Sequence, residues 1–313
     1  MLNEIYMWAG FSVLILALLT LDLKVFHRNP HEVKMKEALI FSAFWIGVSI
    51  VFNVGVYFWG GREAALQFFT GYLIEESLSV DNLFVFLLIF NYFQVPARYQ
   101  HRVLFWGIIG ALVMRGIFIY LGVSLIREFH WILYIFGLIL VVTGVRMMFQ
   151  KEAVEIHPER NIVVRFFKRF FGVTPGYHTQ KFFVKTSSGR FATLLFVVLL
   201  VIETTDLVFA TDSIPAVFAI SRDPFIIYTS NVFAIVGLRS LYFALAGLMD
   251  LFYYLRYGLS VVLSFIGLKM LVSNFVEIPI SIALSVVAGL LAVSIIASVV
   301  RGRRLKGKDN DQL

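Results

Sequence analysis

Charged side chains interrupt two long apolar segments of this sequence. The segments, residues 66–90 and residues 191–220, are each long enough to cross a bilayer. Together they contain six carboxylates, which are Glu75, Glu76, Asp81, Glu203, Asp206 and Asp212. An ionisable group in hydrocarbon costs at least about 2.5 kcal/mol, so acids at this depth usually face a protein interior and have a function. We therefore expect these carboxylates to line a cation pathway.

The side chains next to these acids favour hard cations. Asn82 directly follows Asp81, and Ser213 directly follows Asp212, so amide and hydroxyl oxygens accompany the acids. Mg²⁺, Ca²⁺ and Mn²⁺ prefer such ligands, whereas Zn²⁺ and Cu⁺ favour the imidazole and thiolate groups that both segments lack. Glu76 is a weaker candidate because it can also face the protein exterior. The predicted metal ligands are Glu75, Asp81, Asn82, Glu203, Asp206 and Asp212.

Two basic residues, Arg115 and Arg239, lie in the middle of other apolar runs, and we expect them to act as counter-ions rather than ligands. Mutual salt bridges would be a purely structural explanation of the buried acids. However, six acids against two bases leave four negative charges unmatched. Protons or divalent cations must neutralise this excess, and their competition is a physical basis for proton-coupled exchange.

Helical geometry limits which acids can share one ion. On an ideal helix, Asp81 and Asp212 lie about 120° away from Glu75 and Asp206, respectively. One ion could contact both members of a pair only if the helix were broken. Pro215 is a candidate for such a break, because its ring removes the hydrogen bond to the carbonyl four residues earlier and frees that oxygen as a ligand.

The elements that position these residues are predicted to be transmembrane helices. The chain has 313 residues, of which 59% are hydrophobic and 15% charged, with a mean hydropathy of +0.84. Soluble domains are only about 45–50% apolar, so we predict an all-α polytopic membrane protein. About nine apolar runs are long enough to span a bilayer. They are residues 6–26, 38–59, 66–90, 103–124, 129–149, 191–220, 226–248, 255–273 and 278–300.

Basic residues predict the orientation of these spans. Alternate connections and the tail hold 19 Lys and Arg residues, whereas the intervening connections hold three. This bias places the N-terminus outside and the C-terminus in the cytoplasm. The net charge of +7 follows from these connections, which argues against nucleic-acid binding. The first run lacks a basic leading region, so we expect a retained span rather than a signal peptide.

An internal repeat relates the two acidic segments. Glu75 and Asp206 are 131 residues apart, as are Asn82 and Ser213. Two further sets of matching positions, called landmarks here, are separated by offsets of 124 and 123 residues. The landmark with offset 124 is the pair Arg115 and Arg239. Because three spans separate equivalent positions, the second copy is predicted to be inverted in the membrane. Inverted repeats are typical of alternating-access transporters, whose sites lie near the bilayer midplane.

The repeat divides the chain into six predicted regions, each defined by its spans or its charge. These are two N-terminal spans (1–65), a first three-helix repeat (66–149), a basic cytoplasmic connection (150–190), a second, inverted three-helix repeat (191–273), a ninth span (274–300) and a basic cytoplasmic tail (301–313).

Two stretches of the chain resemble the signatures of the TerC family of integral membrane proteins, named for tellurium resistance. They are residues 70–85, which contain Glu75-Glu76-Ser77-Leu78-Ser79-Val80-Asp81-Asn82, and residues 210–216, which contain Asp212-Ser213-Ile214-Pro215. The likeness extends from about residue 8 to residue 300 and is strongest to the Alx branch. The resemblance implies a bacterial inner-membrane protein related in fold to LysE-type exporters, with manganese efflux as its activity. The acidic positions of the family match Glu75, Asp81, Glu203, Asp206 and Asp212.

Other classes of function make different predictions. An intramembrane aspartyl protease would pair two aspartates, but the Gly-x-Gly-Asp motif of such enzymes is absent, so we expect no catalytic activity and no resident cofactor. A tellurium-resistance component would instead act within a protein complex, and the isolated chain would then move no Mn²⁺. The sequence leaves open the choice among Mn²⁺, Mg²⁺ and Ca²⁺, the coupling to protons, the direction of transport and the oligomeric state.

Overall fold

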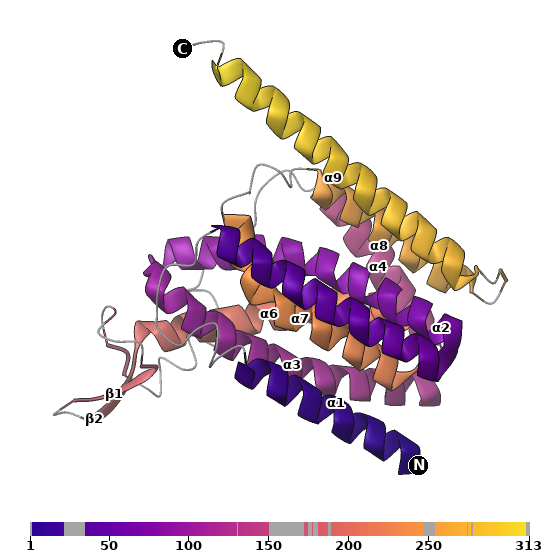
Figure 1. Cartoon of the computed structure of the whole chain (residues 1–313), viewed down its shortest axis with the longest axis horizontal. Coiled ribbons are helices and arrows are strands. Elements are labelled where there is room, and N and C mark those ends of the chain that lie inside the picture. Colours follow the sequence, from indigo (N-terminus) through magenta and orange to yellow (C-terminus); the bar gives the residue numbers. More distant parts are fainter. Residues whose placement is uncertain are drawn as a thin grey trace.

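The protein is an all-α polytopic membrane protein in the computed structural model, which describes residues 2–21, 35–129, 131–149, 172–174, 177, 181–186, 189–246, 254–273, 275–276 and 278–310. Its helices lie side by side in one bundle (Figure 1). In chain order they are α1 (Leu2–Leu21), α2 (Met35–Tyr92), α3 (Ala97–Glu128), α4 (Ile132–Phe149), α6 (Leu194–Phe218), α7 (Pro224–Ala246), α8 (Leu255–Val272) and α9 (Ile280–Asn310).

Helix α2 contains two of the predicted spans in one continuous element. A straight helix of 58 residues would extend for about 87 Å, far beyond the roughly 30 Å hydrocarbon core of a bilayer. The chain turns at Gly61, whose φ of 81° and ψ of −178° are accessible to glycine but strained for other residues. The residues on either side of Gly61 remain helical, so the connection expected between residues 59 and 66 is a single-residue kink.

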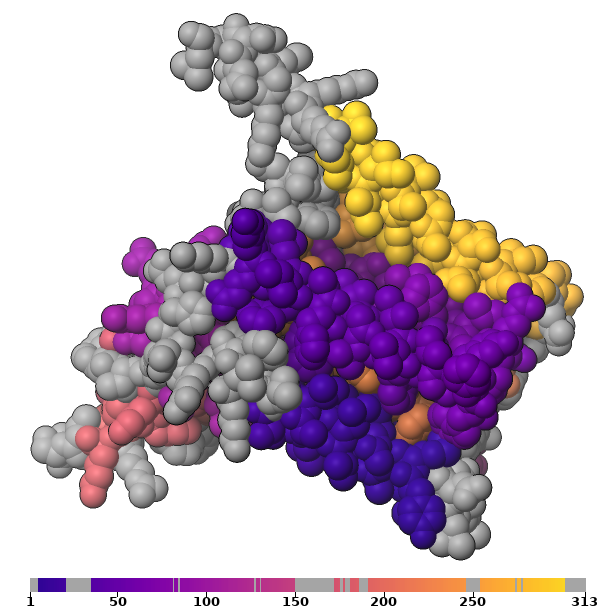
Figure 2. Space-filling view, viewed as in Figure 1, coloured from indigo at the N-terminus to yellow at the C-terminus, as the bar shows by residue number. Residues whose placement is uncertain are grey.

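Seven helices in the described residues are long and apolar enough to cross a membrane, and α1 adds a shorter apolar stretch, Ile5–Thr20. Helix α7 is the most central, because it is buried along nearly all of its length and contacts α1, α2 and α3. Helices α1 and α9 lie on opposite edges of the bundle, and α2 and α9 cover much of the face seen in Figure 2. Their exposed leucine, isoleucine, valine and phenylalanine side chains provide an apolar outer surface. The total of nine spans stays a prediction.

Helices α4 and α8 cross at closely opposed glycines. A Cβ atom placed on Gly267 would lie 2.6 Å from the carbonyl oxygen of Gly137 and 2.8 Å from the backbone nitrogen of Val141. A Cβ atom on Gly144 would lie 2.6 Å from the carbonyl oxygen of Ser260. With the predicted offset of 123, residues 137 and 144 correspond to 260 and 267, so the two contacts exchange under the repeat. This is the pattern expected of two units related by a two-fold axis, although the repeat itself stays a prediction.

Most of the predicted basic connection, residues 150–190, lies outside the described residues. The part that is described includes a short antiparallel hairpin of β1 (Phe183–Thr186) and β2 (Gly189–Ala192), in which Phe183 pairs with Ala192. Just after this hairpin, the hydroxyl of Thr193 donates to the carbonyl oxygen of Lys181 at 2.9 Å. The hairpin is therefore anchored to the start of α6, and it is a small β element that the sequence analysis did not predict.

Candidate intramembrane charged site

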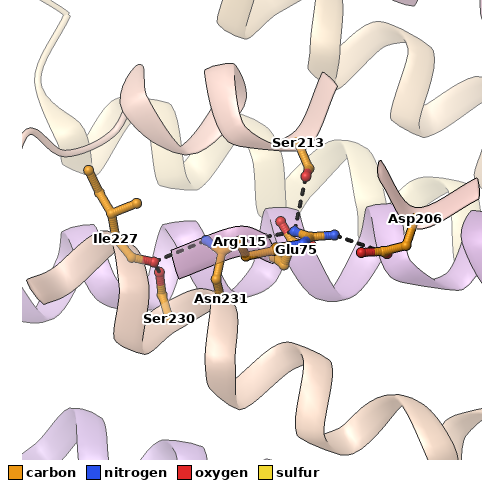
Figure 3. A network of polar contacts seen from close by, with 7 residues as sticks. All are labelled: Glu75, Arg115, Asp206, Ser213, Ile227, Ser230 and Asn231. Carbon is orange, nitrogen blue, oxygen red and sulfur yellow. Dashed lines mark hydrogen bonds and ion pairs between the residues drawn. The ribbon is translucent and has the colours of Figure 1, made fainter. Parts of the chain in front are cut away.

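The side chain of Arg115 joins four helices at the centre of the bundle. It extends from α3 and is 1% exposed. Its Nη1 atom donates to Glu75 of α2, to Ser213 Oγ of α6 at 3.0 Å and to Asn231 Oδ1 of α7 at 2.9 Å (Figure 3). Its Nη2 atom lies 3.5 Å from Oδ1 of Asp206 on α6. The expected role of Arg115 as a counter-ion is confirmed, and it neutralises part of the charge of two acids.

The two acids beside Arg115 are equivalent positions of the predicted repeat. Glu75 and Asp206 are both buried, and both contact the same guanidinium group. Among the described residues, Glu75 Oε2 and Asp206 Oδ2 have no hydrogen-bond partner, and the buried hydroxyl of Ser79, one turn from Glu75, has none either. A buried polar group left in this way costs about 1–3 kcal/mol. Within the direct contacts of Arg115, two acids face one base, so this network has both surplus negative charge and acceptor atoms to receive a cation.

One buried stripe of helix α6 carries the polar side chains of Asp206 and Ser213. Asp206, Ala210 and Ser213 are spaced by four and three residues, and all three are buried. The break expected at Pro215 is wrong, because α6 continues through this residue and ends at Phe218. Proline has a φ close to that of a helix, so within a well-packed bundle it can remove one hydrogen bond without ending the helix.

The remaining predicted ligands do not converge on Arg115. Asp212 accepts a hydrogen bond from the hydroxyl of Thr143 on α4 at 2.9 Å, which agrees with the expected divergence of about 120° from Asp206. The carboxylate of Glu203 lies against Gly110 of α3, where any larger residue would overlap it. Asn82 is buried on α2. The side chain of Asp81 lies outside the described part of the structure.

Glu76, the weaker candidate, lies on a different side of α2 from Glu75. It is partly buried and interacts with Tyr72, one turn earlier on the same helix. Its Oε2 atom has no hydrogen-bond partner among the described residues. The structure therefore does not bring Glu76 into the network around Arg115.

A small cavity of about 20 Å³ lies beside Asp206 and is also lined by Arg239, Gly107 and Ala111. A space of this size has room for about one water molecule, and most of its lining is apolar, including Phe86, Leu104 and Ile235. Arg239 is 4% exposed, and its guanidinium carbon lies 5.9 Å from the centre of the Phe105 ring. The second predicted counter-ion is therefore buried next to the same acid that contacts Arg115.

The described residues contain no group of three or more His, Cys, Asp or Glu side chains that could hold a metal ion together. The acids whose side chains the structure describes accordingly do not form one preorganised metal cage in this conformation. Instead, Arg115 contacts both of the acids that the predicted repeat relates. Metal binding at this place requires the guanidinium to move or water molecules to complete the ligand set.

Asn231 contributes more to this site than its sequence context indicated. It is not among the predicted ligands. Helix α7 begins at Pro224, and Asn231 lies about two turns into this helix and is completely buried. Its Nδ2 atom donates to the carbonyl oxygen of Ile227, which turns Oδ1 toward Arg115 (Figure 3). The sequence signal for this role is a polar side chain within an otherwise apolar helix.

The bundle and its buried charges define a polytopic helical membrane protein with an ion-paired centre. Comparison with known proteins identifies its family. The profile of the "Integral membrane protein TerC family" matches residues 60–306, and the chain belongs to this family. The matched range includes residues of the central network, namely Glu75, Arg115, Asp206 and Asn231.

The similar proteins span nearly the whole chain. An "Uncharacterized membrane protein STKORF319" of Myxococcus xanthus is 50% identical over 305 residues, which cover 97% of this chain and 95% of that protein. A "Putative membrane-bound redox modulator Alx" of Photorhabdus laumondii is 44% identical over 303 residues, covering 94% of each chain. The protein of the same name from Escherichia coli K12 is 44% identical over 299 residues, covering 93% of each chain. No solved structure matches the chain.

Proposed function

We propose that this protein transports divalent metal cations across the bacterial inner membrane, with Mn²⁺ as the preferred cargo and export as the direction. The observation that carries this proposal is the pair of buried acids, Glu75 and Asp206, with one guanidinium between them. Each acid keeps an oxygen atom without a hydrogen-bond partner in the described structure. A cation is the ligand that a buried surplus of negative charge favours.

The available donors suit a hard cation. The carboxylate oxygens of Glu75 and Asp206 and the hydroxyl of Ser79 are oxygen ligands, and water can supply the others. The described residues of this centre include no imidazole, and the chain has no cysteine, so soft metals are disfavoured. Protons compete with a cation for the same carboxylates, which allows cation movement to be coupled to a pH gradient. The basic connections support a topology with the N-terminus outside and the C-terminus in the cytoplasm.

Reconstitution of the purified protein into liposomes tests this proposal. Uptake of Mn²⁺, Mg²⁺ and Ca²⁺ is measured with and without a pH gradient. We expect Mn²⁺ flux for the unmodified protein, and a loss of roughly 10–100-fold for Glu75→Gln and for Asp206→Asn, since each removes a ligand charge while preserving shape. Absence of flux of all three cations for the unmodified protein would overturn the proposal.

A matched control is available at the end of the bundle. Asp223 is exposed, and its Oδ1 atom accepts a hydrogen bond from the backbone of Phe225 at 2.8 Å, which an asparagine can also accept. Asp223→Asn therefore makes the same chemical change outside the site, and the variant is expected to transport normally. Equal losses in all three variants would indicate a general effect of lost negative charge rather than a site.

The name of the Alx relatives, putative membrane-bound redox modulator, supports a second candidate, a membrane component that modulates redox state. Together with the tellurium-resistance alternative of the sequence analysis, this candidate would act within a protein complex. This chain contains no cysteine, so it cannot perform thiol–disulfide exchange itself. A redox effect would then arise indirectly, through a metal or a partner protein. Metal flux by the purified chain alone favours the transporter, whereas flux that requires a co-purified partner favours the complex.

A further inference from the structure

We propose that Arg239 is a second, alternating counter-ion, which takes the place of Arg115 between Glu75 and Asp206 when the protein exposes its site to the other side of the membrane. This inference rests on the proposed transport function. It assigns Arg239 a positioning role in the transport cycle, because the residue would act on the carboxylates that hold the cargo.

The first support is the correspondence between the two arginines. The offset that relates Arg115 to Arg239 also relates Gly107 to Asn231, and the acids Glu75 and Asp206 are related by the first offset. The guanidinium of Arg115 therefore lies between two equivalent acids, although it comes from only one repeat. The side chains at the centre thus do not follow the predicted two-fold symmetry. Arg115 contacts both acids, whereas Arg239 lines a cavity with only one of them, Asp206.

The second support is the space around Arg239. The cavity of about 20 Å³ is lined by Asp206, Arg239 and Gly107, which are the counterparts of Glu75, Arg115 and Asn231. The other lining residues, which include Phe86, Leu104 and Ile235, are apolar. Gly107 supplies no amide oxygen, whereas its counterpart Asn231 supplies Oδ1 to Arg115. Arg239 and Asp206 line the same cavity, and we expect a shift of one helix against another to bring the guanidinium of Arg239 between the acids.

The third support is a larger cavity at one end of the bundle. It has a volume of about 290 Å³ and is lined by the ends of α6 and α8, including Phe218, Lys269 and Met270. The predicted offset places Arg146 and Met147 at the positions equivalent to Lys269 and Met270. If the repeats exchange conformations, this hollow closes and an equivalent one opens around Met147 at the other end. The alternation of the arginines keeps the acids partly neutralised in both states, since an unpaired buried charge is costly.

The chain has no cysteine, so single-cysteine variants report on each end without further engineering. Met270→Cys and Met147→Cys are the matched reporters, and their reaction rates with a small, charged thiol reagent are measured in vesicles. In the Arg115→Gln background, we expect the rate at residue 147 to rise relative to the rate at residue 270. In the Arg239→Gln background, the ratio should fall, and each change should be roughly fivefold or more.

Opposite shifts of this rate ratio in the two backgrounds support the proposal. If the arginines were needed only for folding, the ratio would change in the same direction in both backgrounds. Shifts of equal sign, or no shift in either background, overturn the proposal. Arg115→Lys and Arg239→Lys keep the charge but lose the branched contacts, so they should give smaller shifts with the same signs, and they decide the test if the glutamine variants do not reach the membrane. Flux assays separate the two proposals. Opposite shifts without metal flux refute the transport function alone, whereas flux without opposite shifts refutes the alternation alone.

Discussion

Two helix contacts in this protein are built in opposite ways. Where α4 crosses α8, glycines bring backbone against backbone, and the contacts exchange under the predicted repeat. Where α2, α3, α6 and α7 meet, the contact consists of the charged and amide groups around Arg115, and it is asymmetric. The first region has no room for even one added methyl group. The second keeps buried polar atoms that have no partner in the described structure.

The difference indicates a division of roles. Close backbone packing between small residues is a strong way to associate helices in a membrane, and it has one well-defined geometry. An ion-paired centre in which Arg115 Nε and Nη2 as well as Glu75 Oε2 and Asp206 Oδ2 have no hydrogen-bond partner among the described residues can adopt other pairings. We therefore expect the α4–α8 contact to stay fixed, or to act as a pivot, while the contacts around Arg115 rearrange.

Removal of the central guanidinium should have the largest effect on stability. Arg115→Met removes the guanidinium that contacts both Glu75 and Asp206 in this structure, and breaking a buried ion pair in this way costs about 3–5 kcal/mol. We expect the thermal midpoint of the purified protein in detergent to fall by roughly 10 °C. Adding Glu75→Gln should recover part of this loss. Arg98→Met, at an exposed arginine, is the control, and a fall no larger than that of the control would contradict the assigned role.

A methyl group at the glycine crossing should have the next largest effect. Gly267→Ala places a Cβ atom 2.6 Å from the carbonyl oxygen of Gly137, and such overpacking costs about 1–3 kcal/mol. Gly144→Ala should cost a similar amount, because the two contacts are related by the repeat. Gly289→Ala on α9 meets no atom within 4 Å and should be neutral or slightly stabilising. A large cost at only one of the two crossing glycines would break the proposed symmetry.

The hydrogen bond between Thr143 and Asp212 should matter less. Thr143→Val keeps the shape of the side chain but removes the donor to Asp212 Oδ1, at a cost of about 1 kcal/mol. Thermal unfolding in detergent measures the change. Thr211→Val is the matched control, because the hydroxyl of Thr211 is exposed and bonds only to Val208 of its own helix. If the two variants are equally stable, the bond to α4 contributes nothing measurable.

The helical bundle and the two central acids could be predicted from sequence, because both follow from local patterns. Apolar runs of about 20 residues indicate membrane helices, and carboxylates within them must face the interior. The spacing of six residues also predicted that Asp206 and Asp212 diverge, as they do in the structure. These features depend on helical geometry alone.

The remaining features depend on contacts between distant segments. The continuation of α6 through Pro215 reflects packing that a local rule for proline does not include. The role of Asn231 depends on which face of α7 meets α3, and one buried amide does not reveal this. The predicted ligands Glu203 and Asp212 lie away from Arg115 because α3 and α4 provide other surroundings for them. Counting charges in the sequence identified a surplus of carboxylates over basic residues, but not how these carboxylates are distributed in the structure.

The smallest predicted effect concerns the connection between the two repeats, which neither of the compared regions includes. The hydroxyl of Tyr177 donates to the carbonyl oxygen of Phe93 at 2.9 Å, and burial raises the pKa of Tyr177 to about 12. Tyr177→Phe should therefore cost about 0.5–1 kcal/mol at neutral pH. The stability that the hydroxyl provides is complete below pH 10 and is lost as the pH rises toward 12, because the unfolded chain releases the proton first. At pH 7, the thermal midpoint of Tyr177→Phe should lie below that of the unmodified protein, and above pH 10 the two midpoints should converge. A difference between the two proteins that grows with pH would contradict the assigned hydrogen bond.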